Sequence, residues 1–147
     1  MSLDVYLTAK IPVKRSGTGV FVRENGKNRE LTFEEVKQKW PDSDVSIQNY
    51  ETNEVYTANI THNLGTMADK AGLYYPLWRP EEKGYHVAKD LIIPLTRGLK
   101  KLKSKPVEFD TFKPDNGWGS YDGLVTFVEE YLAACHEWPE AEIGVSR

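Results

Sequence analysis

The sequence predicts an α+β fold: a mainly antiparallel sheet with three to four helices packed on one face, in a single domain spanning residues 1–147. Three observations predict it. Apolar residues alternate with polar ones near the start of the chain, recur at helical spacing through the second half, and alternate again at the end. The predicted order is therefore strands, a short helix, strands, three helices and a final strand.

Strand patterns dominate the first half of the chain. Residues 3–11 are apolar at every second position, which is the period of a half-buried strand. Asn25-Gly26 predicts a hairpin, because both residues tolerate positive φ. Residues 45–50 and 55–60 are predicted to form a second strand pair that turns at residues 51–54.

Helix signals begin at Thr32, which forms a capping-box pattern with Glu35 and predicts a short helix over residues 33–40. A second helix is expected to start at Thr61 or Asn63 and to end at Gly72, a suitable C′ residue.

The region after this second helix is expected to alternate between loops and long helices. Residues 74–84 are predicted to be a loop rich in Pro and aromatic residues. Residues 87–102 carry an apolar stripe that predicts a long helix, in which Pro94 either introduces a kink or starts a second helix. After a predicted loop over residues 106–119, Ser120 is expected to cap the last helix, and residues 141–145 alternate as a final strand.

The composition is that of a packed domain. Aromatic residues reach 12% and apolar residues 39%, which argues against disorder. The formal charge of −3 makes nucleic acid an unexpected partner, because phosphate neutralisation normally requires a basic domain. No apolar run approaches the roughly 20 residues that cross a bilayer, so no membrane partner is expected. The single cysteine and the absence of a leader-like start predict a cytoplasmic protein.

Three short segments concentrate the unusual chemistry of the chain: residues 59–63, 77–82 and 116–121. Together they combine amides, a guanidinium and an imidazole with large aromatic rings beside Gly and Pro. A pocket that stacks a planar ligand and hydrogen-bonds its edges needs this mixture, whereas a folding core does not. The predicted ligand-binding residues are Asn59, His62, Asn63, Trp78, Arg79, Asn116, Trp118 and Tyr121.

The first two segments also have structural interpretations. At a strand-to-helix junction, His62 can bind an anion or transfer a proton, or it is a boundary histidine beside helix caps. We favour a core position for Trp78. For Arg79 we favour phosphate binding over pairing with Glu81 or Glu82, because its planar fork binds phosphate bidentately.

The third segment is predicted to be a loop whose glycines allow a close backbone approach just before a helix. A ligand site would use the Asn116 amide and the Trp118 ring together. The alternative is a tight turn in which Trp118 covers the core and Ser120 serves only as a cap.

Other motifs are incomplete. Residues 14–19 lack the Gly-Lys-Ser/Thr ending and the following helix of a phosphate loop, so they are interpreted as a flexible loop. The three histidines show no metal-ligand spacing, and Cys135 lies on an apolar helical stripe. No metal and no cofactor are therefore expected. The lysines of residues 100–105 are interpreted as a solvated helix end.

The chain resembles a family of small uncharacterised proteins from phage and bacterial genomes. The matching pieces are residues 3–7, 58–64, 77–82, 116–121 and 145–147, which together span most of the chain outside residues 12–54. The resemblance implies a shared site and a phage origin, hence the cytoplasm of a bacterial host, and attaches no reaction. Residues 12–54 then correspond to a β-hairpin elaboration that shorter relatives lack.

Three functions are compatible with these features. We expect a protein that binds or sequesters a small nucleotide-like ligand, as a homo-oligomeric phage counter-defence protein would. One alternative is a metal-independent hydrolase of a nucleotide, with His62 as acid or base; the lack of a second catalytic group counts against an enzyme. The other is an inhibitor that docks on a protein through Trp78, Trp118 and Arg79.

Overall fold

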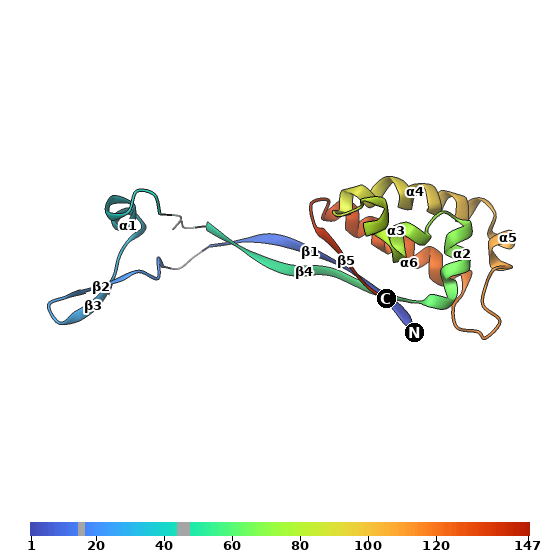
Figure 1. Cartoon of the computed structure of the whole chain (residues 1–147), viewed down its shortest axis with the longest axis horizontal. Helices are drawn as coiled ribbons and strands as arrows, with labels where there is room; N and C mark the ends of the chain where they lie inside the picture. Colours follow the sequence, from blue (N-terminus) through green and yellow to red (C-terminus); the bar gives the residue numbers. More distant parts are fainter. Residues whose placement is uncertain (15–16, 44–47) are drawn as a thin grey trace. The chain divides into compact units, whose positions relative to one another are not determined.

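A computed structural model describes residues 1–14, 17–43 and 48–147, and it has the predicted α+β fold. The chain divides into two compact units, whose elements are labelled in Figure 1. Unit 1 comprises Met1–Ala9 and Asn53–Arg147, and unit 2 comprises Lys10–Thr52. Unit 2 thus contains most of residues 12–54, which the sequence analysis interprets as a β-hairpin elaboration.

The three-stranded sheet has the strand order β4-β1-β5, with β1 at Ser2–Lys14, β4 at Gln48–Thr61 and β5 at Glu142–Ser146. Residues 2–9 of β1, residues 53–61 of β4 and all of β5 belong to unit 1. The alternation at the start of the chain is confirmed, because Leu3, Val5 and Leu7 are completely buried. The predicted final strand is also confirmed, and it pairs antiparallel with β1.

One cross-strand pair of this sheet joins an aromatic ring to a glycine. Tyr6 on β1 lies opposite Gly144 on β5. A Cβ atom placed on Gly144 would overlap the Tyr6 ring, so the ring lies directly across the glycine.

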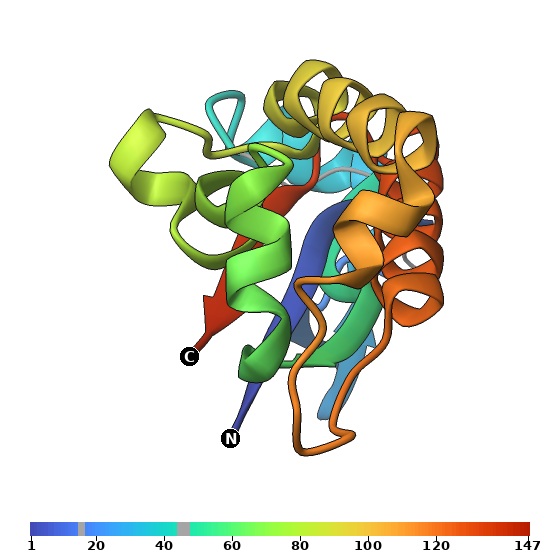
Figure 2. The same ribbon diagram turned by 90° about the vertical axis from the view of Figure 1, so that its right-hand side faces the viewer.

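The helices of unit 1 pack on one face of the sheet, as Figure 2 shows. Two long helices face each other, and their apolar stripes complete a core with the sheet; Leu91 and Leu95 come from one helix, Leu124 and Val128 from the other. The helical elements are η1 (His62–Leu64), α2 (Gly65–Lys70), α3 (Tyr74–Trp78), η2 (Pro80–Lys83), α4 (Ala88–Ser104), α5 (Pro106–Asp110) and α6 (Tyr121–Glu137).

Several predicted helix ends are confirmed. Thr61 caps η1 and Ser120 caps α6, where its Oγ accepts a hydrogen bond from the Gly123 N–H at 3.0 Å. Gly72 adopts φ of 76° just beyond α2. Cys135 is buried on α6 as expected, and burial raises the pKa of its thiol to about 12.

The start of α4 has a cap that the sequence analysis did not identify. Asp90 accepts hydrogen bonds from the backbone N–H groups of His86 and Val87 at 3.0 and 3.1 Å. These donors lower the pKa of the Asp90 carboxyl, because they stabilise its charged form.

The predicted turn at residues 51–54 is wrong, because one continuous strand, β4, runs through it. The polar residues there lie at exposed positions of a strand, and none of them is a glycine or proline that would interrupt it. The polar composition of residues 51–54 therefore reflects exposed strand positions and not a turn. Residues 45–47 of the predicted strand pair lie outside the described residues.

Two predicted loops contain helices. Residues 74–84 form α3 and η2, and residues 106–119 begin with α5. Pro76, Pro80 and Pro106 lie within the first three positions of these helices, where a backbone N–H has no intrahelical partner. The prolines therefore marked helix starts. Pro94 lies inside α4 without dividing it.

Unit 2 contains the hairpin of β2 (Phe21–Glu24) and β3 (Lys27–Glu30), followed by α1 (Phe33–Lys39). The predicted Asn25-Gly26 turn is confirmed, with φ of 50° and 75°. The predicted capping box is also confirmed, since the Glu35 N–H donates to Thr32 Oγ1 and the Glu35 carboxylate accepts from the Thr32 N–H, both at 3.2 Å.

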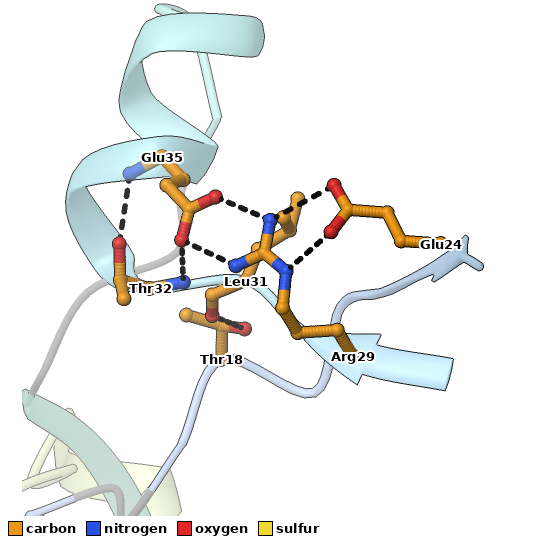
Figure 3. Close-up of polar contacts among 6 residues, drawn as sticks. All are labelled: Thr18, Glu24, Arg29, Leu31, Thr32 and Glu35. Carbon is orange, nitrogen blue, oxygen red and sulfur yellow. Dashed lines mark hydrogen bonds and ion pairs between the residues drawn. The ribbon is translucent and has the colours of Figure 1, made fainter. Parts of the chain in front are cut away.

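Polar contacts connect the elements of unit 2 (Figure 3). The Arg29 guanidinium binds the carboxylates of Glu24 and Glu35. Hydrogen bonds from Arg29 lower the pKa of Glu35 to about 2, and the pKa of Arg29 is raised in turn. The buried Thr18 hydroxyl donates to the Leu31 carbonyl at 2.7 Å, so a second polar contact joins distant parts of this unit.

Candidate functional site

The predicted segments 59–63 and 116–121 meet at a cavity of about 470 Å³ in unit 1. The cavity lies where β1 begins and β4 ends, beside η1 and the loop that precedes α6. Its lining consists of Met1, Ser2, Asn59, Thr61, Asn63, Asn116 and Trp118. Four of the eight predicted ligand-binding residues are among them.

Local hydrogen bonds hold the strand side of the cavity. Asn59 Nδ2 donates to Asp4 Oδ1 at 2.7 Å, which leaves the amide oxygen of Asn59 available. Thr61 Oγ1 accepts the Asn63 backbone N–H at 3.3 Å, so the cap of η1 also positions the Asn63 side chain. Both amides are thus presented from backbone that the sheet or a cap fixes.

The loop side of the cavity depends on two glycines. Asn116 Oδ1 accepts the Trp118 backbone N–H at 2.9 Å, and Gly117 between them has φ of 76°. Gly119 has φ of 119°, and a Cβ there would lie only 2.8 Å from Leu64 Cγ. This close approach brings Trp118 to the cavity, where 70% of its surface is exposed.

The side chains that line the cavity are neutral and mostly polar. Carboxamides supply both donors and acceptors, the hydroxyls of Ser2 and Thr61 do the same, and the Trp118 indole supplies a flat apolar surface. Among the described residues, no Lys, Arg, Asp or Glu side chain lines the cavity. Such a surface can recognise the edge and face of an uncharged ring through hydrogen bonds and stacking.

His62 and Trp78 form a pair beside the core. The Trp78 Nε1–H donates to His62 Nδ1 at 2.8 Å. Because an indole N–H can only donate, Nδ1 of His62 carries the lone pair and the proton of the neutral ring resides on Nε2. Trp78 is 3% exposed and stacks on Tyr74, with ring centroids 5.7 Å apart. The burial of Trp78 agrees with the core position that the sequence favoured.

The remaining predicted residues contact protein groups away from the cavity lining. Arg79 Nε donates to the Tyr74 hydroxyl at 3.3 Å, and Arg79 Nη1 lies 3.7 Å from Glu82 Oε1. The Tyr74 hydroxyl, followed by the Glu82 carboxylate, raises the pKa of Arg79. Tyr121 donates its hydroxyl to the Leu102 carbonyl at 2.8 Å.

Sequence reasoning did not identify Arg147 as a structural partner of residues 77–82. Its Nη1 donates to the Trp78 carbonyl at 2.8 Å and to the Glu81 carboxylate. The bond from Arg147 lowers the pKa of Glu81. The segment that contains Arg79 is therefore held by contacts within the protein.

Ser2 and Thr61 were also missed as cavity residues. Thr61 lies in the predicted segment 59–63 but was interpreted only as a helix cap. No local pattern marks Ser2, which becomes a neighbour of Asn116 only when the strand ends and the loop meet. The described residues contain no group of three or more His, Cys, Asp or Glu arranged to hold a metal ion. Among the same residues, no helix is long and apolar enough to cross a membrane.

These features define an α+β protein with a neutral polar cavity that has an exposed indole at its edge. Comparisons with models of protein families, with curated proteins and with solved structures found no match.

Proposed function

We propose that the protein binds a small nucleotide-like ligand in this cavity. The base would stack on Trp118, and the amides of Asn59, Asn63 and Asn116 would hydrogen-bond the edges of the base and the ribose. The observation that supports the proposal is the convergence of two distant segments on one cavity with these groups. Rings supply contact area and amides supply direction, which a planar polar ligand requires.

The neutral lining makes the proposal more specific. Since none of the described lining residues has a charged side chain, the phosphates of the ligand would extend into solvent and contribute little to affinity. A nucleoside should therefore bind almost as tightly as its nucleotide. The protein would release the ligand intact, as expected for a homo-oligomeric phage protein that sequesters nucleotides in the bacterial cytoplasm.

The hydrolase alternative has weaker support. A general base needs a free lone pair, and the lone pair on His62 Nδ1 already accepts the Trp78 N–H. The inhibitor alternative loses one of its three anchors, because Trp78 is 3% exposed. Trp118 and Arg79 remain accessible to a protein partner.

A thermal-shift screen tests the proposal. Purified protein is incubated with linear and cyclic nucleotides and with the matching nucleosides, and each positive ligand is analysed by chromatography. Binding at 100 times Kd stabilises the protein by about 2.7 kcal/mol, which raises Tm measurably. We expect a shift with the ligand recovered unchanged.

The matched variants are Trp118→Ala and Trp40→Ala. Trp40 is also exposed but lies in unit 2, so its removal controls for the loss of any surface indole. Trp118→Ala should weaken binding about tenfold or more, because a stacked base contributes roughly 1–3 kcal/mol. Equal effects of the two variants, or no shift with any ligand, would contradict the proposal. Ligand consumption that stops in His62→Ala would instead support the hydrolase.

A further inference from the structure

Within the part of the chain that the structure describes, no strand pairs with the outer edge of β4 in unit 1. The strand order β4-β1-β5 leaves one edge on β4 and one on β5. The edge of β5 is partly covered, since the Ile143 N–H donates to the His86 carbonyl at 3.0 Å and Val87 bridges Glu142. For residues 53–61 of β4, the described part of the chain provides no backbone partner on the outer side.

The register between β4 and β1 identifies the free backbone groups. The His62 N–H donates to the Met1 carbonyl at 3.4 Å, and Asn59 contacts Asp4 through its side chain. In an antiparallel ladder, residues that hydrogen-bond the neighbouring strand alternate with residues that face away. The N–H and C=O groups of Val55, Thr57 and Asn59 therefore point outward.

A groove of about 580 Å³ runs between this edge and α6. Thr57 and Asn59 line it from the strand, and Asp122 and Glu130 line it from the helix. The groove floor includes Phe127, which is 6% exposed. No ion pair engages Asp122 or Glu130 within residues 1–14, 17–43 and 48–147. The groove thus combines free strand hydrogen-bonding groups with two carboxylates.

We propose that the outer edge of β4 binds an extended segment of a partner protein as an added strand, with Lys or Arg at positions i and i+4 of that segment. An exposed edge is a template for such pairing. Eight residues of helix separate Asp122 from Glu130 by about 12 Å. Positions i and i+4 of a strand lie about 13 Å apart on one face, so two basic side chains match the two carboxylates.

A second copy of this chain suits the edge less well. Pairing β4 with another β4 would bring two sets of Asp122 and Glu130 together, and residues 53–61 contain Glu54 but no Lys or Arg. Like charges at such an interface oppose binding. This inference uses the backbone of Asn59, whereas the ligand proposed for the cavity would contact its side-chain amide.

The proposal is tested with two labelled peptides that share a Thr- and Val-rich strand sequence. One carries Lys at positions i and i+4, and the other carries Glu there. Fluorescence anisotropy measures affinity, and NMR hydrogen exchange follows the Thr57 and Asn59 amides. The Lys peptide should bind and protect both amides, whereas the Glu peptide should not bind.

Three variants sharpen this test. Asp122→Asn with Glu130→Gln should weaken binding of the Lys peptide about fivefold at low salt. Glu129→Gln removes the same charge from α6, but Glu129 pairs with Lys103 at 3.0 Å outside the groove, so binding should persist. Thr57→Pro removes an outward N–H while preserving pairing with β1, and it should abolish binding.

Any of three results would overturn the proposal. The first is a Lys peptide that does not bind or binds without protecting the Thr57 and Asn59 amides. The second is equal affinity of the Asp122/Glu130 double variant and Glu129→Gln. The third is a peptide-free protein that sediments as a dimer and becomes monomeric in Thr57→Pro, since the occupant would then be a second copy.

Discussion

The two units of this protein are stabilised by different interactions. Unit 1 buries apolar side chains from its sheet and helices in one continuous cluster. In unit 2 the described buried side chains are Thr18, Leu31 and Val36, and the exposed Arg29 network connects its hairpin to α1. Burial of apolar surface is insensitive to salt and pH, whereas exposed ion pairs are screened by both ions and water.

This difference predicts separate opening behaviour. A region with few buried apolar contacts opens locally at a lower free energy than a region with a continuous core. We therefore expect amide hydrogen exchange in unit 2 to occur without unfolding of unit 1. Four sets of variants test this difference between the units.

The largest effect is expected in the core of unit 1. Leu91 on α4 is completely buried, so Leu91→Ala should lower the free energy of unfolding by about 2–5 kcal/mol through lost burial and a residual cavity. Ile93 lies two residues away on the same helix and is 62% exposed. Ile93→Ala should change stability by less than about 0.5 kcal/mol. Urea unfolding measures both, and similar losses would contradict the assigned core.

The second effect concerns the hydrogen bond between Trp78 and His62 in unit 1. Trp78→Phe removes the hydrogen bond to His62 and shrinks a buried ring, which should cost about 1–3 kcal/mol. Trp118→Phe alters an exposed ring and should be nearly neutral. Nitrogen NMR should detect a single Nε2–H tautomer of His62 in the wild type and a mixture in Trp78→Phe. A mixture already in the wild type would disprove the pairing.

The third effect compares equivalent caps in the two units. Thr32→Ala and Ser120→Ala each remove a helix-capping oxygen, which costs about 1 kcal/mol. Because α6 belongs to the continuous core, Ser120→Ala should lower the global free energy of unfolding. Thr32→Ala should instead accelerate hydrogen exchange in α1 alone. The comparison fails if Thr32→Ala lowers global stability as much as Ser120→Ala does.

The smallest effect is electrostatic. Arg29 lowers the pKa of Glu35 from about 4.5 to about 2, so the pair stabilises unit 2 fully above pH 4.5 and loses this contribution as pH falls toward 2. NMR spectra between pH 6 and pH 2 should show loosening of the hairpin and α1 first, while unit 1 remains ordered. Arg29→Met should reduce this pH dependence to the smaller part that comes from the Thr32 N–H, which also lowers the pKa of Glu35.

Arg23 provides the matched control for the electrostatic effect. It lies on β2 and has no ion-pair partner among the described residues. Arg23→Met should retain the pH response of the wild type. A response that disappears in both variants would indicate a general effect of charge on unit 2.

Local patterns predicted the fold correctly where the residue type strongly favours one backbone conformation. The alternation before Lys10, the Asn25-Gly26 turn and the caps at Thr32 and Ser120 are examples. The errors arose where a residue type has two uses. Polar residues occur in turns and on exposed strands, and Pro occurs in loops and at helix starts.

The cavity was predicted only in part, for a similar reason. Asn59, Asn63, Asn116 and Trp118 belong to segments with unusual composition, so the sequence marked them. Ser2 lies outside these segments, and Thr61 lies inside residues 59–63 but was interpreted as a helix cap; only the meeting of strand ends with a loop places both in the cavity. The bond between His62 and Trp78 joins residues 16 positions apart, and no periodic pattern specifies such a contact.

The pair of Tyr6 and Gly144 has a consequence for the history of this protein. Because the tyrosine ring occupies the volume that any side chain at position 144 would need, neither position can change freely while the other stays the same. A lineage that acquires a larger residue at position 144 should carry a smaller residue at position 6. In an alignment of related sequences, positions 6 and 144 should therefore covary.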